Sequence, residues 1–362
     1  MHGRTRRAPG LRRRSNGSDV PWVLTPWGRA LMRAAVMAGL GAPLDVIDVP
    51  DPTPAPHEVV LRVGHCGICG SDLHLHDAFD LPGLVLGHEF AGEVVAVGTE
   101  VDGWAPGRLA AGLSLASCGQ CDHCRAGRVR KCATVAMLGV ERPGAFAEYV
   151  ALPAHDLVDL PANLTSALGA LVEPLSVARH AVERAGGVEG RHTLVIGGGP
   201  VGLAVSLWLP LFGAASVTVS DPAAGRRETA LALGVDAVVD PTAGPVQGAD
   251  GTAPSVVFEC VGLPGLIEGA AAACAVDGRV VVVGVCMGPD TIVPMTAMAK
   301  ELDLAYAFYY RRQDFEATVA ALDDGSLPGD RLITGQVGLD DLPARFDALK
   351  TAKDDVKILL AP

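Results

Sequence analysis

The spacing of apolar residues divides the chain into two regions. Between residues 33 and 69, short apolar runs alternate with proline and glycine, and residues 88–98 and 144–152 continue this pattern. It predicts short strands of a β-rich unit. From residue 165 to 186 the apolar positions take helical spacing, with Pro174 as a local interruption. We therefore expect the architecture to change at this point.

The second half of the chain alternates apolar strands with helices. Residues 192–221 predict a buried strand, a glycine turn, a helix and a second strand that ends at Asp221. The same alternation continues through residues 228–240, 255–262 and 278–285. It is typical of a parallel sheet covered by helices. The tail predicts a helix over 314–329 and a final strand over 356–362.

Composition and charge restrict the possible partners. The 362 residues suffice for two domains, and no uncharged apolar run reaches the length of a membrane span. Of the net charge of −12, the first 30 residues contribute +6, because they hold seven arginines and one aspartate. The acidic remainder argues against nucleic acid as a partner. The basic head lacks the apolar core of a secretory signal, and its composition predicts a disordered extension.

The cysteines predict a structural metal site. Nine cysteines without a secretory signal indicate a reducing, cytoplasmic location, where clustered cysteines are metal ligands more often than disulfides. Four of them form a C-x2-C-x2-C-x7-C pattern: Cys118, Cys121, Cys124 and Cys132. Four thiolates can close a tetrahedron around Zn²⁺ and leave no position for water. An iron–sulfur cluster remains as an alternative, although its usual spacings differ.

A glycine-rich turn predicts a dinucleotide site. Gly197, Gly199 and Gly202 form G-x-G-x-x-G between a predicted strand and helix, and Asp221 ends the next strand. The carboxylate of Asp221 can accept ribose hydroxyls and would repel a 2′-phosphate, which favours NAD, although Arg226 could still accept a phosphate. Two later strand ends should line the nicotinamide. The expected cofactor residues are Gly197, Gly199, Pro200, Val201, Gly202, Asp221, Arg226, Val261, Gly262, Val283, Gly284 and Val285.

Several motifs in combination resemble a known family. They are GICGSDLH at 67–74, GHE at 87–89, GAFAEY at 144–149, EPLSVARHA at 173–181, the four-cysteine segment, the glycine turn and Asp221. From about Met32 to its end, the chain resembles the zinc-dependent medium-chain alcohol dehydrogenases, nearest the threonine, sorbitol and butanediol dehydrogenase branch.

The resemblance implies an α/β chain with a GroES-like β-rich catalytic domain plus a Rossmann domain with a doubly wound parallel sheet. The implied divisions are a basic extension over 1–30, the catalytic domain with its zinc lobe over 31–176, the Rossmann domain over 177–304, and a return to the catalytic domain over 305–362. It also implies two zinc ions per chain, NAD, and a homodimer or homotetramer.

The resemblance also implies a catalytic zinc at Cys69 and His88, with Glu89 and Glu173 competing as the third ligand. A thiolate, an imidazole and a carboxylate would leave a fourth position open for a substrate oxygen. Ser71 would begin a proton relay that His74 continues to solvent. We expect His65, His76, His180 and Cys66 to have packing or surface roles instead.

These features predict hydride transfer between NAD(H) and a secondary alcohol or vicinal diol and its ketone. Sorbitol-type relatives often carry an arginine where Tyr309 stands here, which favours a less hydroxylated substrate. One alternative is a dehydrogenase of polyols, amino alcohols such as threonine, or a biosynthetic intermediate. Another is a dinucleotide-binding protein without catalysis, although the metal and relay residues are all present.

Overall fold

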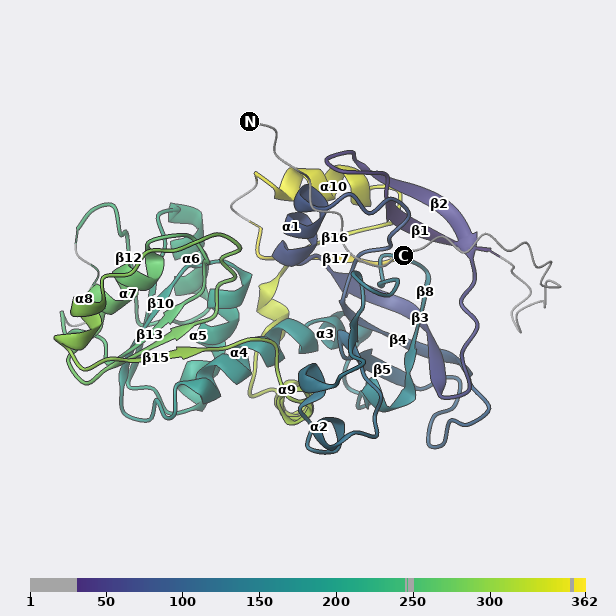
Figure 1. Cartoon of the computed structure of the whole chain (residues 1–362), viewed down its shortest axis with the longest axis horizontal. Helices are drawn as coiled ribbons and strands as arrows, with labels where there is room; N and C mark the ends of the chain where they lie inside the picture. The colour runs from purple at the N-terminus through teal and green to yellow at the C-terminus, as the bar shows by residue number, and fades with distance from the viewer. Residues whose placement is uncertain (1–30, 245, 247–250, 352–354) are drawn as a thin grey trace.

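The computed structural model describes residues 31–244, 246, 251–351 and 355–362; the extension predicted over 1–30 lies outside these ranges. Two large sheets, one of seven strands and one of six, stand side by side (Figure 1). The strands are β1 Leu31–Met37, β2 Leu44–Pro50, β3 Glu58–Gly67, β4 Glu89–Val97, β5 Leu109–Gly112, β6 Leu115–Ala116, β7 Ala136–Met137, β8 Tyr149–Pro153, β9 Leu157–Asp159, β10 His192–Ile196, β11 Ser216–Ser220, β12 Ala237–Val239, β13 Val256–Glu259, β14 Arg279–Val282, β15 Asp303–Tyr306, β16 Ile333–Val337 and β17 Lys357–Leu360. The helices are α1 Gly70–Ala78, α2 Asp122–Arg125, α3 Ser166–Ala170, α4 Val172–Arg184, α5 Pro200–Leu211, α6 Ala224–Ala232, α7 Leu266–Ala273, α8 Pro294–Met298, α9 Arg312–Asp323 and α10 Leu342–Leu349, with 3₁₀ turns η1 Val129–Lys131, η2 Ala154–Asp156 and η3 Gly329–Leu332.

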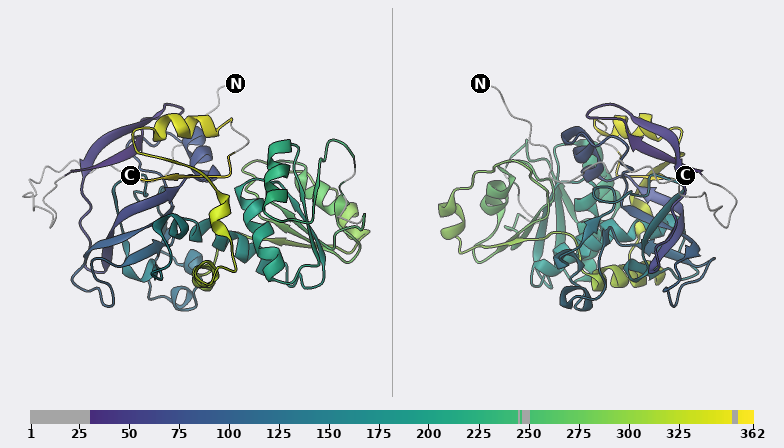
Figure 2. Two further views of the ribbon diagram at one scale, coloured as in Figure 1. Left: turned by 180° about the vertical axis from the view of Figure 1, so that it is seen from behind. Right: turned by 45° about the vertical axis from the view of Figure 1, so that its right-hand side comes forward.

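The seven-stranded sheet joins the two ends of the described chain. Its order is β16-β17-β3-β4-β5-β9, and β8 also pairs with β3. Strand β17 runs antiparallel to β3, with Leu359 opposite Gly67 and Leu360 opposite Cys66. Figures 1 and 2 show the yellow C-terminal strands against the purple and blue N-terminal ones. This pairing brings the last strand next to the beginning of β4.

The six-stranded sheet is parallel throughout and has the order β12-β11-β10-β13-β14-β15. Its central apolar residues, among them Val257, Phe258 and Val281, are fully buried because helices cover the sheet (Figure 1). The chain winds outward from β10 in both directions. The point of reversal therefore lies between β10 and β13, where ligands of open α/β sheets bind beyond the carboxyl ends of the strands.

Helix boundaries differ from the sequence expectation in three places. The helical stretch after residue 165 breaks at Leu171 and not at Pro174, which sits in the first turn of α4, where its missing N–H costs little. The helix predicted over 314–329 ends at Asp323, before the turn that leads to η3. Helix α1 lies in a segment for which apolar spacing predicted no helix, and its faces are correspondingly mixed.

A buried carboxylate holds helices α4 and α9 together. Asp314 accepts hydrogen bonds from the Arg311 N–H at 2.8 Å and pairs with Nδ1 of His180 at 3.0 Å, and its other oxygen pairs with Arg179. Burial acts to raise the pKa of Asp314, but the hydrogen bond to His180 and the neighbouring charges outweigh it, so the pKa is lowered. His180 therefore has the structural role that we expected.

Replacing this carboxylate should destabilise the fold. We expect Asp314→Asn to lower the free energy of unfolding at pH 7 by about 3 kcal/mol, since His180 loses its charged partner and Arg179 keeps only Glu183. Because the pKa in the folded state lies below 3.8, the stabilisation is present above that pH and is lost as the pH falls below it. Urea unfolding followed by circular dichroism measures both effects. Glu316→Gln, which removes an exposed pair with Arg312 on the same helix, is the control and should cost less than about 1 kcal/mol.

Candidate functional site

Three of the residues proposed as zinc ligands converge where α1 meets β4. One ligand atom from each of Cys69, His88 and Glu89 lies within 4.8 Å of the others. Cys69 is the N-cap residue of α1, His88 directly precedes β4, and Glu89 is the first residue of β4. The hydroxyl of Ser71 donates to the Cys69 sulfur at 3.1 Å and lies 3.3 Å from Nε2 of His88. We refer to Cys69, His88 and Glu89, together with the nearby Glu173, as the open cluster.

Asp72 orients the histidine of the open cluster, a role that the sequence analysis missed. Its Oδ1 lies 3.2 Å from Nδ1 of His88, and its Oδ2 accepts the Cys69 N–H at 3.0 Å. Burial acts to lower the pKa of His88, but Asp72 and Cys69 outweigh it and the pKa is raised. With Nδ1 held by a carboxylate, Nε2 faces the cluster as the ligand atom. The position of Asp72 inside the GICGSDLH motif was the available signal.

Glu89 already has a cation as its partner. Nζ of Lys357 lies 2.7 and 2.6 Å from the two carboxylate oxygens and donates to the carbonyl of Ile68 at 3.2 Å. Both charged side chains are buried. Burial lowers the pKa of Lys357, but Glu89 more than offsets it, and the pKa is raised. A lone lysine inside the apolar run VKILL was the sequence signal for this pair, and we did not use it.

Glu173 lies in the first turn of α4, buried and without an ion-pair partner among the described residues. Burial raises its pKa to about 7; Glu89 adds to the rise, and His88, Lys357 and a hydrogen bond from Ser114 oppose it. A nearby cation would stabilise the ionised form of this buried carboxyl group. Together with a thiol and an imidazole, this donor set suits Zn²⁺.

The other residues of this region separate into exposed and buried groups. His74 is exposed on α1, as a last relay group requires, whereas Cys66 is fully buried and its pKa is raised by burial. His76 is buried and bonds to the carbonyl of Ala42 at 2.7 Å. His65 lies 2.7 Å from the Ser166 hydroxyl and also contacts Gln336. Cys66, His76 and His65 are thus buried or hydrogen-bonded, in agreement with the packing or surface roles that we expected for them.

The four cysteines of the C-x2-C-x2-C-x7-C segment form a second cluster, the four-cysteine lobe. The sulfur atoms of Cys118, Cys121, Cys124 and Cys132 all lie within 4.8 Å of one another. The N–H of Cys118 points to the sulfur of Cys132, and that of Cys124 to the sulfur of Cys121, each at 3.5 Å. Backbone N–H groups directed at sulfur stabilise thiolates. The donors therefore fit a closed tetrahedral zinc site.

The predicted cofactor residues gather at the carboxyl edge of the parallel sheet. Gly197 has φ +101°, and a Cβ on Gly202 would lie 1.8 Å from the Gly197 carbonyl, so the turn and the helix packing both require glycine. Gly199 is the N-cap of α5 and leaves the N-terminal N–H groups without a side-chain cap. This end of α5 can therefore receive a pyrophosphate. Val261, Gly262, Val283, Gly284 and Val285 follow the ends of β13 and β14, with Gly262 packed against Val285.

Asp221 is buried at the end of β11 and braces the glycine turn. Its Oδ2 accepts the Gly198 N–H at 2.9 Å, and its Oδ1 accepts the Ala223 N–H at 2.8 Å. Each oxygen keeps a lone pair for a ribose hydroxyl. Arg226 lies 3.6 Å from Oδ2, close enough to reduce the negative charge at this position. The geometry is thus compatible with NAD, which Asp221 favours, and also with a contact between Arg226 and a 2′-phosphate.

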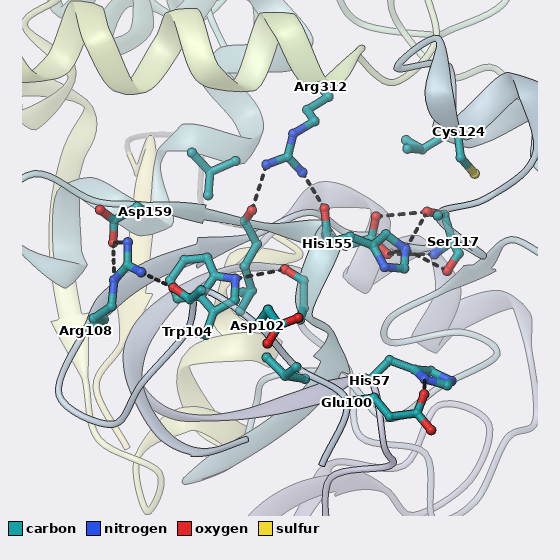
Figure 3. Close-up of a pocket in the computed structure, with 18 of the residues that line it drawn as sticks. His57, Glu100, Asp102, Trp104, Arg108, Ser117, Cys124, His155, Asp159 and Arg312 are labelled. Atoms are coloured by element: carbon teal, nitrogen blue, oxygen red, sulfur yellow. Dashed lines mark hydrogen bonds and ion pairs between the residues drawn. The ribbon is translucent and has the colours of Figure 1, made fainter. Parts of the chain in front are cut away.

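A cavity of about 780 Å³ lies beside the four-cysteine lobe, away from the open cluster, and Cys124 and Ser117 line part of it (Figure 3). Its arginines are already paired. Arg108 bonds to Asp159 at 2.9 Å, and Arg312 bonds to Glu316 at 2.8 Å and to backbone carbonyls. No guanidinium group is left here to receive an anion, so we assign no reaction to this cavity.

Comparison with known proteins identifies relatives across nearly the whole chain. The model described as "Alcohol dehydrogenase GroES-like domain" matches residues 55–162, and the one described as "Zinc-binding dehydrogenase" matches residues 200–324. The 2-dehydro-3-deoxy-L-galactonate 5-dehydrogenase of Pseudoalteromonas atlantica is 34% identical over 85% of this chain and 92% of its own. The L-threonine 3-dehydrogenase of Mesorhizobium japonicum is 31% identical over 89% and 96%. A zinc-binding dehydrogenase of Sinorhizobium meliloti 1021, solved bound to NADP, has a TM-score of 0.85 and 32% identity and covers 92% of this chain and 100% of its own.

The Lys357–Glu89 pair should matter for stability before any metal binds. We expect Lys357→Met to lower the free energy of unfolding of the chelator-treated protein by about 3–5 kcal/mol, because Glu89 is left buried without a partner. Lys350→Met is the matched control: its ammonium pairs with Asp77 and Asp347 at the surface and should cost less than about 1 kcal/mol. Urea unfolding of both variants tests this, and equal losses would contradict it.

Proposed function

The chain belongs to the zinc-dependent medium-chain alcohol dehydrogenase family, and we propose that Cys69, His88 and Glu173 hold its catalytic zinc. It is an oxidoreductase that transfers a hydride between an alcohol and a nicotinamide dinucleotide, with zinc as its metal. One observation carries the choice of ligands: Glu89 is neutralised by Lys357, whereas Glu173 is buried without an ion pair among the described residues.

The pairing with Lys357 distinguishes the two carboxylates. To bind zinc directly, Glu89 would have to leave an ammonium that contacts both of its oxygens and would leave Lys357 buried with an unpaired charge. Glu173 has no ion pair among the described residues that zinc binding would break, and its burial disfavours an isolated negative charge. Glu89 then stays paired with Lys357 beside the metal site.

The side chains around the open cluster suit proton removal from an alcohol. Zinc supplies a Lewis acid that lowers the pKa of the substrate hydroxyl, and the nicotinamide accepts the hydride. The Ser71 hydroxyl lies beside both Cys69 and His88 and can receive the substrate proton there. His74, one turn further along α1 and exposed, can pass a proton to solvent. Asp72 fixes the tautomer of His88 throughout.

We propose a secondary alcohol as the substrate. The names of the two relatives denote oxidation at position 5 of a sugar acid and at position 3 of threonine, and both are carbons inside a chain. A cavity beside the β6–β7 pair has apolar and aromatic walls that include Met137 and Tyr309, together with Arg130 and Glu141. Polyols and amino alcohols remain within this class.

A pair of cysteine variants tests the ligand assignment. We expect Cys69→Ala to bind one zinc fewer per chain than the wild type and to lose activity far beyond the roughly 10- to 100-fold that outer partners of a metal site cost. Cys66→Ala, a neighbouring buried thiol outside the donor set, should keep its zinc and its activity. Zinc content by mass spectrometry and reduction of NAD with a panel of secondary alcohols provide the measurements. Full activity of Cys69→Ala would exclude the proposed metal role.

We propose NAD in preference to NADP, because the Asp221 carboxylate stands where a 2′-phosphate would bind. Asp221→Asn keeps an acceptor but removes the charge, so the ratio of kcat/KM for NAD to that for NADP should fall by roughly 10-fold or more. Asp240→Asn, at the end of the next strand, removes a carboxylate paired with Arg227 and should leave this ratio unchanged. An unaltered ratio in Asp221→Asn would show that another group selects the cofactor.

We also propose that the protein forms a homo-oligomer and that it is located in a reducing compartment. Strand β15 is an edge strand, and exposed apolar residues lie near it, among them Met287, Val293, Met295 and Met298. A second copy that covers this edge would give a homodimer, from which a tetramer can be built. All nine cysteines are free, which suits a reducing compartment such as the cytoplasm. Within the described ranges, no helix has the length and apolar character needed to cross a bilayer.

We also propose the domain division inferred from the motifs, with residues 31–176 and 305–362 forming the catalytic domain around residues 177–304. The strands of the parallel sheet, β10 to β15, support it because they run from His192 to Tyr306. The last of these strands continues two residues past the proposed boundary.

A further inference from the structure

A second, smaller cavity lies next to the open cluster. It has a volume of about 260 Å³, and its walls include Leu115, Met137, Tyr309, Arg130 and Glu141. Leu115 and Met137 face each other across the β6–β7 pair. The cavity therefore combines apolar walls with one cationic and one anionic side chain. We call it the outer pocket.

Ser114 connects the outer pocket to the open cluster. Ser114, directly before β6, donates its N–H to the Tyr310 hydroxyl at 2.9 Å, and it also hydrogen bonds to Glu173. The Tyr309 hydroxyl contacts the sulfur of Met137 at 2.8 Å. Burial raises the pKa of Tyr309 to about 12, and the charge of Glu173 adds to the rise. Tyr309 therefore forms part of the wall of the outer pocket, and the residue after it, Tyr310, bonds to Ser114.

The backbone at Tyr309 supports a functional role for this wall. Its φ of +58° lies in the left-handed region, which a bulky side chain rarely adopts. The ring is held in place by Phe308, with centroids 4.5 Å apart, and by Tyr310 at 6.4 Å. Strain of this kind persists where the surroundings fix a conformation, and such positions concentrate at ligand sites.

Arg130 is the cation of the outer pocket, and it is an exposed residue. It lies in η1 within the four-cysteine lobe, and its guanidinium makes no ion pair, side-chain hydrogen bond or ring contact with the described part of the chain. In contrast, Arg108 and Arg312 at the cavity of Figure 3 are both paired. Glu141 makes no ion pair with Arg130 in the described part of the chain, and its Oε2 accepts the Met137 N–H at 2.7 Å.

We propose that the substrate is a hydroxy acid whose carboxylate binds Arg130 in the outer pocket while its carbinol carbon lies at the open cluster. This inference rests on the proposed function and specifies the substrate class. A guanidinium matches a carboxylate with two parallel hydrogen bonds, and Arg130 is exposed, so its guanidinium is accessible to a substrate carboxylate. Glu141 favours a hydrogen-bond donor, such as a hydroxyl or an ammonium group, beside that carboxylate.

Arginine variants and paired substrates test the proposal. The substrates are 3-hydroxybutyrate, threonine and gluconate, each compared with its neutral primary amide, in a zinc-loaded full chain with NAD. The variants are Arg130→Ala, Arg130→Lys and the control Arg128→Ala, an exposed arginine of the same lobe that does not line the outer pocket. Zinc content confirms that each lobe is intact. Binding of the same acids to the enzyme–NADH complex, followed by NADH fluorescence, provides a readout that does not need turnover.

We expect the wild type to prefer at least one acid over its amide. Arg130→Ala should raise KM for that acid roughly 10- to 100-fold, with kcat little changed, because the contact binds substrate and transition state alike. Arg130→Lys should restore part of the loss, and Arg128→Ala should behave as wild type. Equal use of acids and amides by the wild type, or an unchanged KM in Arg130→Ala, would overturn the proposal and leave the dehydrogenase assignment standing. Failure to oxidise acids, amides and neutral secondary alcohols alike would count against the proposed function itself.

Discussion

A buried ion pair between Lys357 and Glu89 is the interaction on which the proposed metal site depends. Lys357 belongs to the last strand and Glu89 to the first residue of β4, and the pairing of β17 with β3 brings them together. Two opposite charges in a buried site are tolerated only as a pair. Because Glu89 is paired with Lys357, we propose Glu173 as the carboxylate that binds the metal. The C-terminal strand thus contributes to the site although it supplies no metal ligand.

The two metal sites differ because their surroundings differ. The four-cysteine lobe offers four sulfurs from one short segment, so the site closes on itself and holds a lobe with little apolar core. The open cluster draws its donors from α1, the start of β4 and α4, which leaves one face uncovered beside Ser71. The parallel sheet presents its glycine turn and helix N-terminus for the cofactor. We therefore propose that the four-cysteine lobe uses its metal to stabilise the fold, and that the open cluster uses its metal in the reaction.

Local patterns predicted most of the architecture and the close approach of the four cysteines. Short spacings, such as the four cysteines or G-x-G-x-x-G, bring residues together through local geometry, and the structure agrees. Contacts between distant segments escaped prediction: Lys357 reaches Glu89 across 268 residues, and Tyr310 reaches Ser114 across 196. Apolar periodicity also missed α1, because that helix buries polar side chains such as Asp72 and His76. Long-range pairing of charges leaves no periodic signal in a sequence.

The most direct test is a crystal structure of the zinc-loaded protein, with anomalous diffraction recorded on both sides of the zinc absorption edge. We expect two peaks per chain, one among the sulfurs of the four-cysteine lobe and one bounded by Cys69, His88 and Glu173, with Glu89 still paired to Lys357. A single peak in the four-cysteine lobe at saturating zinc would contradict this assignment. A second peak bound directly by Glu89, with Lys357 displaced, would contradict the role given to the ion pair.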